Sequence, residues 1–293
     1  MFLIIHNPLS NNRKSKKTTN KIVRFFRRSQ IPFIVRSSLK IENLDVFLAE
    51  NPKIEHILHL GGDGSINYLI NSVDVTKITQ SIYLSKSGSG NDFLRSLKQI
   101  SSGDVTLSQA STNVGDTLFI NGCGIGVDAS VCHYVNNDKR KNKLSYFKNV
   151  FKAVADFKRV EIDLVVDGKE FHYDDAYFVS IQNGKYFGGG MKVAPNADIT
   201  DDQYVVCVAY NLNAFLLQIL FLSIYSGNHV HFTKRVAMHQ GKDISVKVSR
   251  PCFFQADGEV LADVQSFSVK KTGSRELIAF QKKAVKAQFS TRK

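Results

Sequence analysis

A chain of 293 residues that is 43% hydrophobic and 22% charged can bury a full core, and its length favours two domains. Lysine and arginine number 39 against 26 acidic residues; the resulting net charge of +13 favours anionic partners, whether nucleotide, nucleic acid or an acidic membrane face. No apolar stretch approaches the ~20 residues that span a bilayer. The four cysteines lie far apart in the sequence, at positions 123, 132, 207 and 252, which argues against a disulfide framework or a zinc site and favours a reducing compartment.

The first hundred residues alternate short apolar runs with helix-like segments, which predicts a βαβα series. Strands are expected at 2–6, 33–36, 56–60 and 81–84, and helices at 16–29, 42–50, 65–72 and 91–97. Such a series builds a parallel sheet with right-handed crossovers. Every loop that follows a strand therefore leaves the same edge of the sheet, where ligands bind.

Three of these loops are rich in Gly, Ser, Asn and Asp: residues 7–11, 61–65 and 86–92. In GGDGS at 61–65, glycines let the main chain approach a phosphate, and the N–H groups of the helix start point at the anion. Asp63 in this loop either holds Mg²⁺ or accepts a proton. The pentapeptide alone is equally compatible with a turn in which Asp63 caps its helix. The loop at 86–92 repeats the design with Asp92.

From about residue 118 the pattern changes to short β-branched and aromatic runs, which predicts antiparallel sheet. Strands are expected at 160–166, 175–182, 204–210 and 243–248, and helices at 146–157 and 213–225. Asp167-Gly168 between two alternating runs predicts a tight hairpin turn. The domain boundary is expected near residues 112–120, where the hydrophobic period changes.

The segment 254–261 places Asp257 and Glu259 around Gly258, between apolar runs. Asp-Gly is an ordinary hairpin turn. A turn facing the site would also bring one of these carboxylates to a substrate hydroxyl as a general base. The two interpretations are compatible.

Taken in order, the sequence blocks resemble the catalytic domain of the diacylglycerol kinase and sphingosine kinase superfamily, especially stand-alone bacterial diacylglycerol kinase-like lipid kinases. The matching blocks are Asn7-Pro8-x-Ser10, GGDGSIN at 61–67, GSGNDF at 88–93, FINGCGIGVDASV at 119–131, FGGGMKVAPNA at 187–197 and DGE at 257–259. The motif GGDG at 61–64 alone is not specific to this superfamily, because NAD kinases and phosphofructokinases also carry it. The combination is specific.

The resemblance implies an α/β plus β fold in two domains. Residues 1–117 would form a Rossmann-like, NAD kinase/diacylglycerol kinase-like nucleotide-binding domain, to which residues 276–293 return. Residues 118–275 would form an antiparallel β-sandwich domain for the lipid substrate. ATP and lipid would meet between the two.

The resemblance also implies roles for individual residues. Glu259, assisted by Asp257, resembles the acceptor of the lipid hydroxyl proton. Asp63 and Asp92 resemble acids of a magnesium–water network, with Asp63 part of the catalytic set, and Asp201 resembles the side chain that binds a structural magnesium. The nucleotide contacts implied are Asn7, Pro8, Ser10, Asn11, Ser38, Gly62, Asp63, Gly64, Ser65, Ile66, Asn67, Ser89 and Asn91.

Several positions depart from the family pattern, and three of them bear on the site. Asn113 stands where many members have an aspartate of the metal network, with Asp116 as a nearby replacement. Tyr68 replaces a glutamate, and Asp202 stands at a usual glycine beside Asp201.

The expected function is an ATP- and Mg²⁺-dependent lipid kinase that phosphorylates a lipid hydroxyl, with diacylglycerol as the leading substrate and phosphatidic acid as product. The alternatives are a lipid- or nucleotide-binding protein without robust catalysis and an NAD kinase-like enzyme for a soluble substrate. The basic run at 13–28 is either a solvated face or a contact with an anionic membrane. We expect a cytoplasmic, peripheral membrane protein that binds no nucleic acid, and a homodimer is left open.

Overall fold

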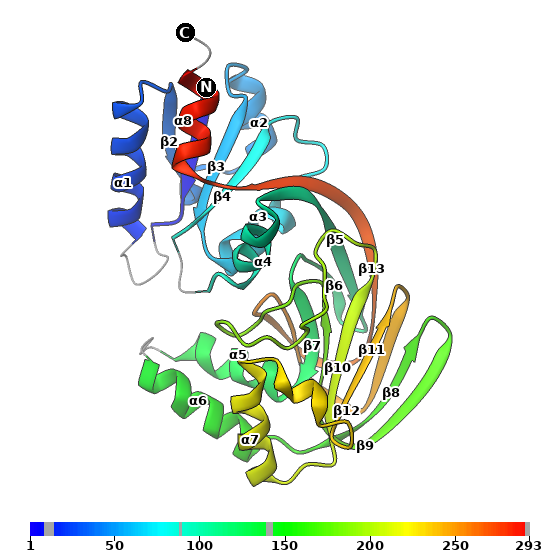
Figure 1. Ribbon diagram of the computed structural model, residues 1–293. Coiled ribbons are helices and arrows are strands. Elements are labelled where there is room, and N and C mark those ends of the chain that lie inside the picture. The colour runs from blue at the N-terminus through cyan, green and yellow to red at the C-terminus, as the bar shows by residue number, and fades with distance from the viewer. Residues whose placement is uncertain (9–14, 88–89, 139–142, 291–293) are drawn as a thin grey trace. The chain divides into compact units, whose positions relative to one another are not determined.

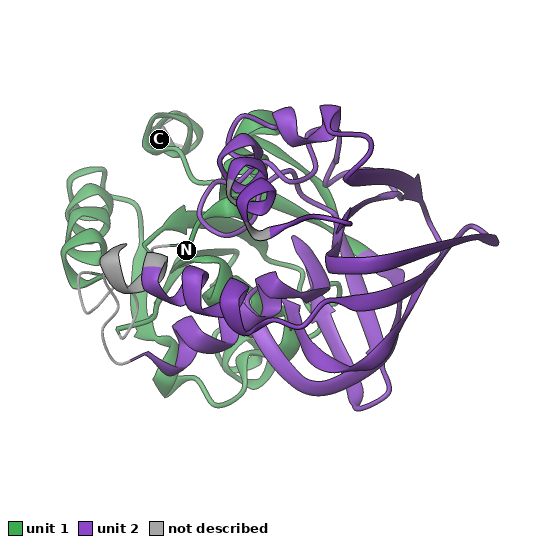
Figure 2. Cartoon of the chain, turned by 90° about the horizontal axis from the view of Figure 1, so that it is seen from below, with its two compact units in different colours: residues 1–105, 274–293 green, residues 106–273 purple. Residues whose placement is uncertain are grey.

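The computed structural model describes residues 1–8, 15–87, 90–138 and 143–290 (Figure 1). The chain divides into two compact units, residues 1–105 with 274–293 and residues 106–273 (Figure 2). Each unit has its own hydrophobic core.

The first unit contains a parallel sheet in the order β13-β4-β3-β1-β2. Its strands are β1 (Phe2–His6), β2 (Phe33–Ser37), β3 (His56–Gly61), β4 (Ser81–Lys86) and the last residues of β13 (Glu259–Ala279). Its helices are α1 (Ser15–Arg28), the 3₁₀ turn η2 (Ser38–Lys40), α2 (Leu44–Glu50), α3 (Asp63–Ser72), α4 (Asp92–Ile100) and α8 (Lys282–Ser290). The predicted βαβα series is confirmed.

The strand β3 is buried along its whole length, as expected for a central strand of a parallel sheet that is covered on both faces. On one face, Phe26 of α1 and Val285 of α8 join Phe2 and Leu58 in a single apolar cluster. The C-terminal helix therefore completes the core of the first unit.

The second unit is antiparallel, with strands in the order β11-β10-β9-β7-β12-β13. β8 pairs with both β9 and β12, and β5 pairs with β6 and β13. The strands are β5 (Ser102–Thr112), β6 (Gly115–Phe119), β7 (Gly122–Gly126), β8 (Val160–Val166), β9 (Lys169–Gln182), β10 (Tyr204–Tyr210), β11 (Val236–Gly241) and β12 (Ile244–Ala256). The helices are α5 (Val127–Asn137), α6 (Lys143–Asp156), α7 (Ala214–Ile224) and the 3₁₀ turn η3 (Asn228–His231). The predicted fold class, α/β plus β, is confirmed.

Both Asp-Gly pairs form tight turns between antiparallel strands. Asp167 and Gly168 have φ of 48° and 79°, and Asp257 and Gly258 have φ of 50° and 94°. Positive φ at both central residues is the requirement of a primed hairpin turn, which aspartate and glycine tolerate. The hairpin predictions are confirmed.

Candidate functional site

The glycine-rich loops after β3 and β4 are bonded to each other. Gly61 pairs with Lys86 at the ends of the two strands. The N–H of Ser87 donates to the carbonyl of Gly61 (2.9 Å), and the N–H of Asp63 donates to the carbonyl of Gly90 (3.3 Å). Gly61 needs to lack a side chain, because a Cβ there would lie 2.5 Å from that of Ser65. The two loops therefore form one structure at the ligand-binding edge.

The carboxylate of Asp63 joins these loops. Its Oδ2 accepts from the N–H of Asp92 (2.8 Å) and its Oδ1 accepts from the N–H of Phe93 (3.2 Å). Asp63 is the first residue of α3, and the N-cap of that helix is Gly62. The alternative in which Asp63 caps its own helix is thus wrong, since the carboxylate binds the N-terminus of α4, where the helix dipole stabilises negative charge.

The residues at this edge fit magnesium shared with phosphates. Asp63 and Asp92 belong to the first turns of neighbouring helices, and Asp92 is 4% exposed. Carboxylate oxygens are the protein ligands that Mg²⁺ prefers, and this ion usually takes one or two of them besides phosphates and water. Among the described residues, there is no cluster of three or more His, Cys, Asp or Glu side chains that could hold a metal ion.

The other expected nucleotide contacts are distributed as follows. Asn7 and Pro8 follow β1, whose end pairs with that of β3. Gly64, Ser65, Ile66 and Asn67 lie in the first turns of α3, with Ile66 and Asn67 buried. Asn91 is the N-cap of α4. Ser38 opens η2, one residue after β2 ends at Ser37. Ser10, Asn11 and Ser89 lie outside the described residues. The roles of all these residues remain predictions.

In the second unit, Asp257 fixes the turn that precedes Glu259. Its carboxylate accepts three backbone N–H groups, from Ile120 (2.8 Å), Asn121 (2.9 Å) and Gly122 (3.0 Å). This bonding holds the β12–β13 turn against the start of β7. Glu259 follows with an exposed side chain. Asp257 is therefore placed to position Glu259.

Sequence reasoning assigned no role to Asp128, at the start of α5. Gln255 donates to its Oδ2 (3.4 Å) and accepts from the N–H of Gly258 (3.0 Å), which links Asp128 to the turn that carries Glu259. The Oδ1 atom of Asp128 is buried without a hydrogen-bond partner. Burial raises the pKa of this carboxyl to about 6. Asp128 lies within the sequence block 119–131, but its position in the sequence does not indicate that its carboxyl is buried.

We expect Asp128→Asn to stabilise the protein at neutral pH. The pKa is raised from an ordinary 3.8 to about 6, so the folded state binds the proton more tightly and loses stability as pH rises from about 4 to about 6. Above that range the buried charge costs about 3 kcal/mol, which the amide avoids. Urea unfolding of both proteins at pH 4.5 and 7.5 measures this effect. A difference in stability that does not grow with pH would contradict it.

Asn113 occupies the β5–β6 turn and bonds to the backbone of β13. Its Oδ1 accepts from the N–H groups of Gln265 (2.8 Å) and Ser266 (3.2 Å), and its Nδ2 donates to the carbonyl of Asp263 (3.2 Å). An aspartate cannot make the last bond, because a carboxylate only accepts. The amide at this position therefore has a structural function. The nearby Asp116 accepts from Gln109 (2.6 Å).

The acids around Asp201 are already engaged. Asp198 accepts from the N–H and hydroxyl of Thr200 (2.9 and 2.7 Å), and Asp202 pairs with Lys242. Asp201 accepts from the N–H of Gln203 (3.0 Å). These contacts do not fit a metal ion bound by several carboxylates. Asp201 as a single-side-chain magnesium ligand remains a prediction.

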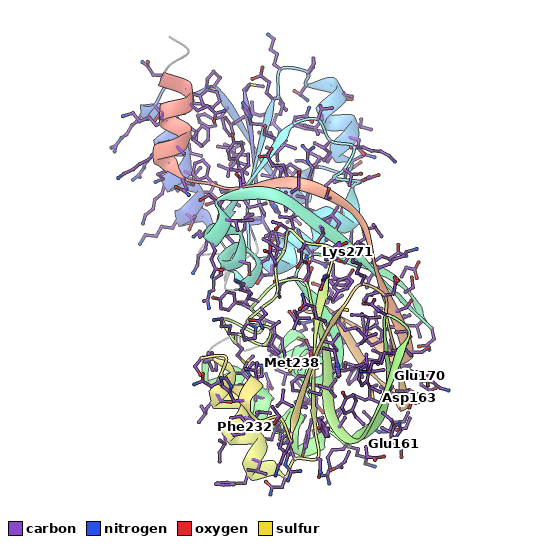
Figure 3. The ribbon with its side chains drawn as sticks, turned by 45° about the vertical axis from the view of Figure 1, so that its right-hand side comes forward. Glu161, Asp163, Glu170, Phe232, Met238 and Lys271 are labelled. Atoms are coloured by element: carbon purple, nitrogen blue, oxygen red, sulfur yellow. The ribbon has the colours of Figure 1, made fainter. Side chains whose placement is uncertain are left out.

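A half-buried ammonium supplies positive charge to this segment. Nζ of Lys271, labelled in Figure 3, donates to Asn183 (2.6 Å) and Thr106 (2.8 Å), and it lies 4.2 Å from the ring centroid of Tyr204. Burial lowers the pKa of Lys271 to about 8, while the negative charge of Asp201 opposes the shift. The ammonium thus holds three segments of the second unit together.

We expect Lys271→Met to lower the free energy of unfolding by about 2 kcal/mol, because two hydrogen-bond acceptors and Asp201 lose a half-buried cation. The matched control is Lys242→Met, which removes an exposed lysine from an exposed pair and should change the free energy of unfolding far less, because solvent screens such pairs. Urea unfolding of each protein, with Mg²⁺ or with EDTA, measures both. If EDTA destabilises the wild type as much as Asp201→Asn does, a metal ion holds the segment in place of the ammonium.

Two family models match the chain. The diacylglycerol kinase catalytic domain matches residues 1–117, and the YegS C-terminal NAD kinase beta sandwich-like domain matches residues 122–271, more than half of the chain. The class that emerges is a kinase-family protein with an α/β catalytic domain and a β-sandwich-like domain. The chain belongs to the family of bacterial diacylglycerol kinase-like proteins, and the resemblance drawn from its sequence blocks is confirmed.

Relatives and solved structures agree. The chain is 27% identical over 242 residues to a Bacillus subtilis protein named "Putative lipid kinase YtlR", covering 71% of this chain and 75% of that protein. It is 23% identical over 215 residues to a Staphylococcus carnosus protein named "Putative lipid kinase", covering 70% of each. The crystal structure of a "putative diacylglycerol kinase" from Bacillus anthracis superposes with a TM-score of 0.71 over 95% of each chain, at 19% identity. This last likeness concerns the fold alone.

Proposed function

We propose that the protein is an ATP- and Mg²⁺-dependent lipid kinase that transfers the γ-phosphoryl group of ATP to a lipid hydroxyl, with diacylglycerol as substrate and phosphatidic acid as product. The observation that carries the proposal is the Asp63 carboxylate, which is fixed across two glycine-rich loops at the strand ends of a kinase-family domain. The names of the relatives, which refer to lipid kinases, support the acceptor class.

In this proposal, the loop N–H groups and the first turn of α3 receive the phosphates of ATP. Magnesium held by Asp63 and Asp92 would neutralise phosphate charge when bound. The oxygen of the lipid hydroxyl bonds to the γ-phosphorus while Glu259 accepts the hydroxyl proton. The bond between that phosphorus and the bridging oxygen of ADP breaks, and ADP leaves. Asp257 positions Glu259 through the turn that it holds.

The lipid acceptor lies in a membrane, so the protein has to reach a membrane surface. No helix in the described parts of the chain is long and apolar enough to cross a bilayer. A net charge of +13 attracts the anionic inner leaflet. We therefore propose peripheral association with the cytoplasmic face of the membrane.

The test is an assay of the purified protein with γ-labelled ATP, Mg²⁺ and diacylglycerol in mixed micelles, beside the same assay with NAD. We expect labelled phosphatidic acid and no labelled NADP. Labelling of NAD alone would favour the NAD kinase-like alternative. Binding of ATP without labelling of any lipid in a broad panel would favour a binding protein on a kinase scaffold.

A further inference from the structure

The helix α7 carries large apolar side chains on both of its faces. The inner face consists of Leu217, Leu220 and Ile224. These side chains are buried in an apolar cluster that also contains Ala153 of α6. The outer face exposes Phe215 (69%), Ile219 (40%) and Leu222 (71%). Their i, i+4, i+7 spacing places all three on one side of the helix.

The outer apolar surface continues beyond the helix. Tyr225 is 45% exposed at the C-cap of α7, and Phe232 is 41% exposed after η3 and lies beside α7 in Figure 3. We call this surface the α7 face, composed of Phe215, Ile219, Leu222, Tyr225 and Phe232. Single apolar residues are common on protein surfaces. A contiguous group of large exposed apolar side chains is uncommon and indicates an interaction site.

The charges around the α7 face identify its partner. The sequence contains no acidic residue between Asp202 and Asp243, a stretch that includes the whole face and the exposed Lys234. Lys148 and Lys152 are exposed on α6, which packs on the same core cluster as α7. A second copy of the chain would bring these like charges together in a symmetric contact, which is unfavourable. Anionic lipid headgroups over an acyl layer match both the charge and the apolar side chains.

We propose that the α7 face docks the protein on an anionic lipid bilayer, with its aromatic and aliphatic side chains entering the interface. The inference deepens the proposed function, on which its lipid partner rests. The end of α7 is tied to the glycine-rich block 187–197, because Lys192 N–H donates to the carbonyl of Ile224 (2.9 Å) and His229 Nε2 donates to that of Val193 (2.9 Å). Docking would therefore fix this block relative to the bilayer.

The first test is co-sedimentation with vesicles of phosphatidylglycerol and phosphatidylcholine, and with phosphatidylcholine alone. We expect the wild type to bind the anionic vesicles, and the triple variant Phe215→Ser, Ile219→Ser, Leu222→Ser to bind them at least about tenfold more weakly. The triple variant Lys148→Gln, Lys152→Gln, Lys234→Gln should lose the preference for anionic vesicles. The control Leu39→Ser, Val46→Ser removes exposed apolar residues of the first unit and should bind like the wild type.

Three further readouts complete the test. Thermal unfolding should show that the α7 variant folds like the wild type, because the substituted side chains are exposed. With a short-chain, water-dispersed diacylglycerol the α7 variant should keep the wild-type rate while losing activity on vesicles. If the wild type binds vesicles as expected but phosphorylates no lipid, docking stands and the proposed function fails. Equal vesicle binding by the α7 variant overturns the inference, and a loss of dimer in sedimentation without a change in vesicle binding assigns the face to self-association instead.

Discussion

Asp63→Asn is expected to lower the rate of phosphoryl transfer at saturating ATP by about 10²–10³-fold, the usual effect of removing one preorganised electrostatic group from an active site. The amide keeps an oxygen for one of the two N–H donors of α4, but it provides no negative charge for Mg²⁺. Initial rates of labelled phosphate transfer over a range of Mg²⁺ concentrations measure the loss. A higher Mg²⁺ requirement in the variant would place the effect at the ion.

The matched control is Asp74→Asn, which alters an exposed acid of the same unit that bonds to Thr76 and Lys77. It should leave the rate unchanged. A purely structural role for Asp63 predicts a different result, a loss of about 1 kcal/mol in stability from a weakened helix cap with kcat intact. Urea unfolding beside the rate measurement distinguishes the two, and a wild-type rate in Asp63→Asn removes this residue from the proposed chemistry.

Glu259→Gln is expected to lower kcat by about 10²-fold or more, because the amide cannot accept the proton of the attacking hydroxyl. The turn that carries Glu259 is held by Asp257, Gln255 and Asn136, which bonds to the carbonyl of Gly258 (3.0 Å). None of these contacts uses the Glu259 side chain, so the substitution should not disturb the fold. Single-turnover labelling of diacylglycerol at several pH values is the measurement.

Glu161→Gln provides the control for this variant. Glu161 is an exposed acid of β8, in the same unit, and is labelled in Figure 3. We expect it to label lipid at the wild-type rate. If Glu259→Gln does so too, the general base is another group, and Asp128 with its raised pKa becomes the next carboxyl to substitute.

The local patterns of the sequence predicted much of the fold. The alternation of apolar runs and helical periods located the first four strands and their helices to within a few residues. The strand β7 was not predicted, because its sequence GCGIG has the composition of a loop. Its glycines are required by close packing, since a Cβ on Gly124 would lie 2.3 Å from the carbonyl oxygen of Val179 on β9. Such an approach depends on a strand more than fifty residues away in the chain.

The sequence by itself determined the features that arise from neighbouring residues: the hydrophobic period, the Gly-rich loops after strands, the positive-φ turns at Asp-Gly pairs and the net positive charge. The tertiary structure alone decided which groups face one another. It placed the Asp63 carboxylate on α4 and not on its own helix, gave Asn113 a bonding partner on β13, and buried the carboxyl of Asp128. The physical reason is that hydrogen bonds between distant segments and the removal of water from a charge depend on the packing of the whole unit. The GGDGS loop, recognisable from sequence, therefore acquires its chemistry from residues that begin almost thirty positions later.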